Sequence, residues 1–96
     1  MRMELRFVVY RLPEGAWRAV CLEYGLKING VSPKHAITEL AYALVHHIAF
    51  NRPFAPAEPD DWMKFASAAD MVFDFELKLE IDNNYIHMTA VTRTIG

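Results

Sequence analysis

The stretch Cys21–Leu44, CLEYGLKINGVSPKHAITELAYAL, decides the fold that we expect for this chain. It opens at the end of an alternating segment, turns at Tyr24-Gly25 and continues through a short apolar segment at residues 26–28. Ser32-Pro33 is a strong helix start, because a serine hydroxyl can accept a hydrogen bond from a first-turn amide and proline loses nothing at the first helical position. The stretch therefore predicts strand, turn, strand and capped helix in immediate succession.

Apolar residues recur at helical spacing after Pro33, which predicts an amphipathic helix from Pro33 to about Phe50. The expected apolar stripe consists of Ile37, Leu40, Ala41, Leu44, Val45 and Ile48. The opposite face carries His35, Glu39, Tyr42 and His46. Asn51-Arg52-Pro53 is expected to end the helix, since proline disfavours a helical residue before it.

The residues before this stretch alternate in the manner of β-strands. Residues 4–10 and 16–23 form the two alternating segments, and Leu12-Pro13-Glu14-Gly15 supplies the turn between them. One face is expected to hold Leu5, Phe7 and Val9 from the first strand with Trp17, Ala19 and Cys21 from the second. With residues 26–28 as a third strand that ends at Asn29-Gly30, the pattern predicts an antiparallel meander under the helix.

The second half of the chain predicts a connector, a short helix and a β-hairpin. Pro53, Pro56 and Pro59 favour an extended connector, and Asp60-Asp61 suit the start of a short helix at residues 62–68. Its anchoring side is expected to be Trp62, Phe65 and Ala69. From Val72 the period is two, with Phe73, Phe75, Leu77, Leu79 and Ile81 against Asp74, Glu76, Lys78, Glu80 and Asp82. A turn at residues 82–84 leads into a partner strand at residues 85–95.

These elements predict one α+β domain over residues 1–96, with the long helix on one sheet face. Residues 1–50 form an antiparallel β-β-β-α core, residues 51–70 the Pro-rich connector and short helix, and residues 71–96 the C-terminal β-hairpin. Hydrophobic residues make up 53% of the chain and aromatic residues 12%. This content favours either a dense core or apolar surface that faces another copy or a partner.

The charge balance limits which kinds of function fit this chain. Ten Lys and Arg residues stand against twelve Asp and Glu residues, which leaves a net charge of −2. No basic run occurs, which argues against sequence-independent phosphate binding. No apolar run approaches the ~20 residues that span a membrane, and the first residues do not have the pattern of a signal peptide. We therefore expect a soluble, cytoplasmic protein.

Several residue identities resemble the HicB-like antitoxin family and the small standalone proteins related to it. The resemblance covers roughly residues 5–50, and it rests on Trp17 in GAWRAVCLEYG, on Cys21, Leu22, Glu23, Gly25 and Leu26, on Gly30, on Ser32-Pro33 and on Ala36, Ile37, Leu40 and Ala43. It implies a partial RNase-H-like or double-stranded-RNA-binding-like fold, assembly as dimers or tetramers, and a small mRNA-cleaving toxin as partner. The C-terminal third departs from the family, because it has no strand-helix-helix pattern and no basic recognition helix for an operator.

The residues that often carry chemistry do not assemble into a catalytic set in the sequence. His35 and His46 are eleven residues apart, about 16 Å along a helix, which is too far for one metal ion. The acidic row Asp74, Glu76, Glu80 and Asp82 recurs at steps of about 6.5–7 Å on an outward strand face, which is typical of a solvated surface. Cys21 is the only cysteine, which excludes an intrachain disulfide, and no basic neighbour in sequence activates it. We expect no catalytic residue, no metal and no cofactor.

The sequence thus favours a non-enzymatic, oligomeric protein-binding module, antitoxin-like in covering a small basic toxin. Its unpaired strand edges are candidate surfaces for self-association into a dimer or tetramer. The candidate partner-binding residues are Tyr10, Trp17, Tyr24, Tyr42 and His46. A first alternative is nucleic-acid binding through a basic sheet face of Arg2, Arg6, Arg11, Arg18 and Lys27. The others are a small enzyme with a histidine and a carboxylate at a subunit interface, small-molecule binding, and a purely structural or self-assembly role.

Overall fold

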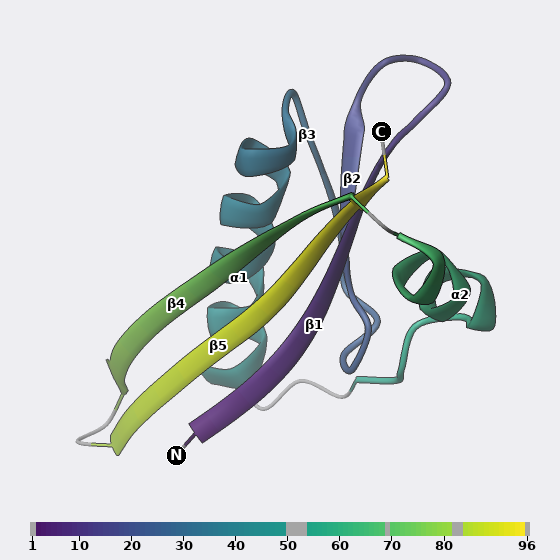
Figure 1. Ribbon diagram of the computed structural model, residues 1–96. Helices are drawn as coiled ribbons and strands as arrows, with labels where there is room; N and C mark the ends of the chain where they lie inside the picture. Colours follow the sequence, from purple (N-terminus) through teal and green to yellow (C-terminus); the bar gives the residue numbers. More distant parts are fainter. Residues whose placement is uncertain (1, 50–53, 69, 82–83, 96) are drawn as a thin grey trace.

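The computed structural model describes residues 2–49, 54–68, 70–81 and 84–95, and is shown in Figure 1. Within these ranges the chain has an α+β fold with five strands and two helices. In chain order they are β1 (Arg2–Arg11), β2 (Trp17–Cys21), β3 (Lys27–Gly30), α1 (Pro33–Ala49), α2 (Pro59–Ser67), β4 (Asp70–Ile81) and β5 (Asn84–Ile95). The strands form one sheet in the order β3-β2-β1-β5-β4.

The predicted meander is confirmed. β1 pairs antiparallel with β2, and β2 pairs antiparallel with β3. The β1–β2 turn closes as expected, because the N–H of Leu12 donates to the carbonyl of Ala16 at 2.7 Å and the N–H of Gly15 donates to that of Leu12 at 2.9 Å. Gly15 has φ +98°, a conformation that favours glycine. Lys27–Gly30 is extended, so the third strand includes Asn29-Gly30, which the sequence pattern placed at its end.

The predicted antiparallel arrangement is matched only in part, because the core and the C-terminal hairpin join in parallel. β5 pairs antiparallel with β4, as the predicted hairpin requires, but it lies parallel to β1, with Leu5 opposite Ala90 and Phe7 opposite Thr92. The sheet is therefore mixed. Parallel neighbours need a long crossover connection, and residues 12–83 supply it, since they include β2, β3, both helices and β4. In Figure 1 the two chain ends accordingly lie toward opposite ends of β1 and β5.

α1 covers one face of the sheet over β1, β2 and β3. Its inner side buries the predicted residues Ile37, Leu40, Ala41 and Leu44, together with Ala36, while Val45 and Ile48 are half-buried. The opposing sheet residues include Leu5, Phe7, Val9, Ala19, Cys21, Met88 and Ala90. The Ser32 hydroxyl accepts a hydrogen bond from the His35 N–H at 3.1 Å, which confirms the predicted cap. Such a cap contributes about 1 kcal/mol, and each fully buried leucine contributes roughly 2 kcal/mol.

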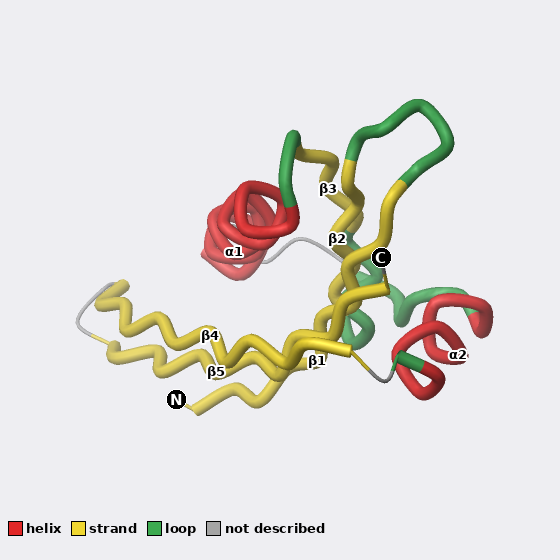
Figure 2. The backbone as a smooth tube through the Cα atoms, turned by 45° about the horizontal axis from the view of Figure 1, so that its top comes forward, coloured by secondary structure: helices red, strands yellow, loops and turns green. Residues whose placement is uncertain are grey.

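α2 covers the opposite face, so the fold has helices on both sides of the sheet (Figure 2). Trp62 and Phe65 pack as predicted, against a second small core of Val8, Val20 and Leu22, joined by Tyr10, Ala57 and Ile95. The Ala57 N–H donates to the Leu22 carbonyl at 2.8 Å, which holds the connector against the end of β2. Neither described helix has the length and apolar content to cross a membrane.

Some sequence predictions fall outside the described residues. They are the helix end at Asn51-Arg52-Pro53, the anchoring role of Ala69 and the turn residues Asp82-Asn83.

Candidate functional site

The five predicted partner-binding residues lie on separate parts of the molecule. Tyr10 packs on the α2 side of the sheet, whereas Trp17 and Tyr24 pack against the core under α1. Tyr42 and His46 lie on the exposed side of α1. The structure therefore does not bring the five into one site, and only Tyr42 and His46 share an exposed face.

Tyr24 is engaged by side chains of its own chain. Its ring lies 4.3 Å from that of Phe54 and 6.2 Å from that of His47, measured between centroids. Burial is the main cause that raises the pKa of the Tyr24 hydroxyl. His47 of α1 is half-buried, and its Nε2 is buried with no hydrogen-bond partner among the described residues. These contacts hold the connector against the end of α1.

The exposed side of α1 carries a line of residues that we call the outer stripe. It consists of His35, Glu39, Tyr42 and His46, which recur at helical spacing on α1, together with Val31 just before the helix. Two large apolar side chains stand out from it, since Val31 is 83% exposed and Tyr42 60%. The packed inner face of α1 holds this stripe in a defined position on the sheet.

His35 at the start of the outer stripe is oriented by two contacts. Its Nδ1 accepts a hydrogen bond from the Val31 N–H at 3.0 Å, and its Nε2 lies 3.7 Å from a Glu39 carboxylate oxygen. A ring nitrogen that accepts a hydrogen bond carries no proton, so in this geometry Nε2, which faces Glu39, is the nitrogen that can donate. His35 therefore acts here as part of the helix start.

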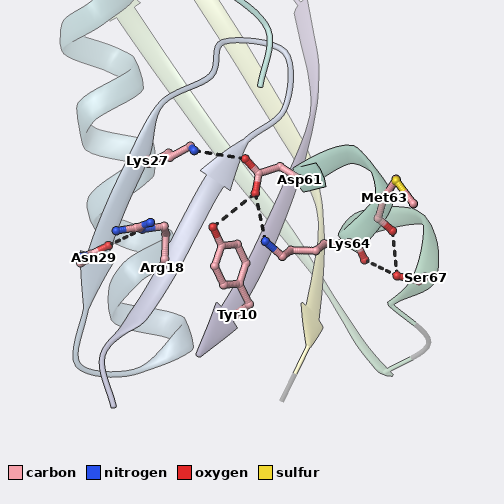
Figure 3. A network of polar contacts seen from close by, with 8 residues as sticks. All are labelled: Tyr10, Arg18, Lys27, Asn29, Asp61, Met63, Lys64 and Ser67. Carbon is pink, nitrogen blue, oxygen red and sulfur yellow. Dashed lines mark hydrogen bonds and ion pairs between the residues drawn. The ribbon is translucent and has the colours of Figure 1, made fainter. Parts of the chain in front are cut away.

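A buried carboxylate lies beneath α2 (Figure 3). Asp61 is only 2% exposed, and its carboxylate accepts a hydrogen bond from the Tyr10 hydroxyl at 3.3 Å. The Nζ of Lys27 lies 3.4 Å away and that of Lys64 3.8 Å. A buried charge is costly unless it is paired, and these groups pair it. The cluster ties α2 to β1 and β3.

The sequence pattern marks Asp61 only as an acidic residue at a helix start and does not show this role. A usable signal was present, because Asp61, Phe65 and Ala68 recur at positions i, i+4 and i+7 on the side of α2 that packs. That spacing places the carboxylate on the sheet side. Its partners on β1 and β3 are distant in sequence and were not visible in the pattern.

Cations cover the aromatic rings around α2. Arg6 lies 4.8 Å from the Trp62 ring, Lys64 4.3 Å from that of Tyr10, and the Arg93 guanidinium 4.6 Å from that of Phe65. Such contacts contribute about 0.5–1 kcal/mol at exposed sites. These three ring faces are therefore used within the chain to hold α2.

The basic face proposed for nucleic-acid binding is partly neutralised. Arg6 pairs with a Glu23 carboxylate at 2.9 Å, and Lys27 pairs with Asp61. Arg18 Nε donates to the Asn29 side-chain oxygen at 3.0 Å, and Arg2 lies 4.0 Å from Glu4. Arg6 and Arg18 do share the α2 side of the sheet, but their contacts within the chain reduce what is free for phosphate.

The acidic row of β4 is described at one position. Glu76 Oε1 lies 3.1 Å from His87 Nε2 and 3.5 Å from Lys78 Nζ, and the hydrogen bond from His87 is the first cause that lowers the pKa of the Glu76 carboxyl. A carboxyl whose pKa is lower in the folded than in the unfolded protein stabilises the fold at pH values above its unfolded pKa. That stabilisation is lost as the pH falls through its folded pKa. The structure does not describe the side chains of Asp74 and Glu80, nor any part of Asp82.

Neither metal binding nor thiol chemistry finds a site in the described residues. Across residues 2–49, 54–68, 70–81 and 84–95, no three His, Cys, Asp or Glu side chains come together as metal ligands. Cys21 is buried under α1, and burial is the main cause that raises the pKa of its thiol to about 12. The thiolate is the reactive form, so native Cys21 is expected to be inert.

We expect Cys21 to react with DTNB at least about 100-fold more slowly in the folded protein than in concentrated guanidinium chloride. Both burial and the raised pKa oppose the reaction, and unfolding removes both. The absorbance of the released thiolate anion at mildly alkaline pH measures the two rates. Equal rates would contradict the buried position of this thiol.

The chain matches no protein-family model, no curated protein and no solved structure. A functional assignment therefore rests on the residues and their geometry. The described residues offer an outer stripe with exposed apolar side chains and, beneath α2, a charged cluster whose groups are paired within the chain.

Proposed function

We propose that this protein is a non-enzymatic, HicB-like module that self-associates and binds another protein, a small basic RNA-cleaving toxin. The outer stripe carries the proposal, because it presents Tyr42 to solvent on a helix that is packed from behind, with the exposed Val31 just before the helix start. The sequence resemblance over residues 5–50 supports the choice of partner. So does the net charge of −2, which complements a basic protein.

The outer stripe has the features of a protein-recognition surface. Tyrosine is enriched among residues that dominate binding, because it buries a large area and loses few side-chain rotations. The part of the stripe on α1, from His35 to His46, extends about 16 Å along the helix, which fits within the patch of ~800 Å² that a standard interface buries on each partner. Glu39 lies between them and is exposed, so it places negative charge where a basic partner would dock.

Replacing Tyr42 with alanine is expected to weaken partner binding by about 10- to 100-fold, which corresponds to the loss of an aromatic anchor. The tagged chain is first used to recover its partner from the native host, where we expect a small basic protein in stoichiometric amount. Titration calorimetry with the purified partner then compares the wild type with the variant.

Met63→Ala is the matched control, because Met63 is a large apolar side chain on the other helix and is 68% exposed. It should bind the partner as the wild type does. Recovery of the chain alone, or equal affinity of Tyr42→Ala and the wild type, would contradict the proposed role of the outer stripe.

A further inference from the structure

The two edges of the sheet differ in length and in cover. β3 is a four-residue strand, and α1 lies against it so closely that a Cβ on Gly30 would come within 2.6 Å of the Ala36 nitrogen. β4 is twelve residues long and ends the strand order at the other edge. α1 lies against β1, β2 and β3, and α2 lies against β1 and β5. Figure 1 shows β4 extending along the outer side of β5.

A long edge strand presents a row of backbone N–H and carbonyl groups that can pair with another strand. Proteins usually blunt such edges with short strands, proline or covering segments. The β4 sequence, DMVFDFELKLEI, contains no proline and alternates apolar with mostly charged residues. Charged side chains and bulges also blunt edges, but the register shift in β4 lies between Asp70 and Val72. Residues 73–81 pair regularly with β5 and can therefore continue the sheet.

We propose that β4 pairs antiparallel with β4 of a second copy, around a two-fold axis at Leu77, to give one continuous sheet through both subunits. This inference rests on the self-association contained in the proposed function and names its surface. A two-fold axis suits an antiparallel pair, because each copy offers the same strand in the opposite direction. The occupant of the edge is thus the chain itself.

The charges and the length of β4 together select this register. With the axis at Leu77, Glu76 of each copy lies opposite Lys78 of the other, at the 4.5–5.5 Å Cβ spacing of directly opposed residues. An axis at Glu76 sets two glutamates opposite each other, and an axis at Lys78 sets two lysines opposite each other. Both side chains are exposed and lie 3.5 Å apart within the chain, so the dimer brings four charges of alternating sign together. An axis at Leu79 would also set Lys78 opposite an acidic residue, Glu80, but it would pair only residues 77–81, whereas the axis at Leu77 pairs residues 73–81.

The same register also brings like charges together, which limits the affinity of the dimer. Positions 74 and 80, both acidic in the sequence, come opposite each other twice in the dimer. Like charges in directly opposed positions weaken strand pairing. We therefore expect dissociation in the micromolar range, where dilution of the purified chain can follow it.

The test is a charge swap followed by sedimentation velocity over about 1–200 µM protein. The wild type should be dimeric at the upper end of this range. Glu76→Lys and Lys78→Glu should each raise the dissociation constant at least about 10-fold, because each turns two attractive pairs into repulsive ones. The double variant E76K/K78E should regain the wild-type dissociation constant, since the pairs are restored with their signs exchanged.

Glu14→Lys and Lys34→Glu are matched controls, because both residues are exposed and lie on the β1–β2 turn and at the start of α1. They change the net charge equally and should leave dimerisation unchanged. Glu76→Lys also removes the contact between Glu76 and His87 within the chain. The double variant lacks this contact too, so recovery of its dissociation constant would show that the charges across the dimer, and not the His87 contact, cause the effect. Circular dichroism confirms that each variant is folded.

The outcomes separate this inference from the proposed function. A chain that is monomeric at every concentration overturns both the β4 dimer and the self-association from which it follows. A wild type that associates while both single reversals leave its dissociation constant unchanged overturns the β4 register alone. Failure of the double variant to recover has the same meaning.

Discussion

Replacing Gly25 with alanine is expected to lower the free energy of unfolding by about 3–5 kcal/mol. Gly25 has φ +70°, where a side chain costs roughly 1–2 kcal/mol. A Cβ at this position would also overlap the carbonyl oxygen of Ala55 and lie 3.4 Å from the carbonyl carbon of Pro56. These atoms are backbone, so the connector itself must move. Urea denaturation followed by circular dichroism measures the change.

Gly15→Ala is the matched control for this prediction. Gly15 also has a positive φ, +98°, but the nearest atom to its added Cβ is a side-chain nitrogen of Arg11 at 3.9 Å. Only backbone strain applies there, so we expect a loss of about 1–2 kcal/mol. Equal losses at Gly15 and Gly25 would show that the connector gives way without cost, and would contradict its close packing on the β2–β3 turn.

Replacing Asp61 with alanine is expected to cost about 2–4 kcal/mol, because it leaves the Tyr10 hydroxyl and two ammonium groups without their buried acceptor. The cost stays below that of a fully buried pair, since the side chains of Lys27 and Lys64 are 36% and 41% exposed and can turn to water. Asp61→Asn keeps the shape and one acceptor, so it should lose about half as much. The same urea denaturation measures both variants.

Asp60→Ala separates burial from helix electrostatics. Asp60 is exposed and lies beside Asp61 in the first turn of α2, so both residues face the same helix N-terminus. Its removal should change stability by no more than about 0.5 kcal/mol. If Asp60→Ala and Asp61→Ala were equally destabilising, the helix dipole and not the buried cluster would explain the effect.

The Asp61 cluster also bears on the proposed interface. β4 begins at Asp70, directly after α2 ends at Ser67, so the anchoring of α2 helps to place the start of the edge strand. The three cation–aromatic contacts and the Asp61 cluster together hold this short helix on the sheet. A helix of nine residues has little stability of its own, so these tertiary contacts decide its position.

The residues of the candidate site differ in how far the sequence alone predicts their positions. Helical spacing alone predicted that Tyr42 and His46 share the exposed face of α1, because residues four apart are neighbours on any helix. Sequence could not show that Tyr10, Trp17 and Tyr24 lie apart from that face. Their positions depend on how strands and helices pack, and no short-range pattern records this.

The sequence by itself determined the local elements of this protein. Alternation predicted which residues of β1 and of β2 share a face, and Ser32-Pro33 predicted where α1 begins, because strand pleat, helix period and helix caps act between residues close in the chain. Only the tertiary structure decided that β5 lies parallel to β1, that α2 takes the opposite face and that Asp61 is buried. Each of these depends on partners more than 30 residues away, such as Tyr10 with Asp61 and Leu5 with Ala90. Such contacts form only when all the strands have paired and the two helices have packed on the sheet, one over each core.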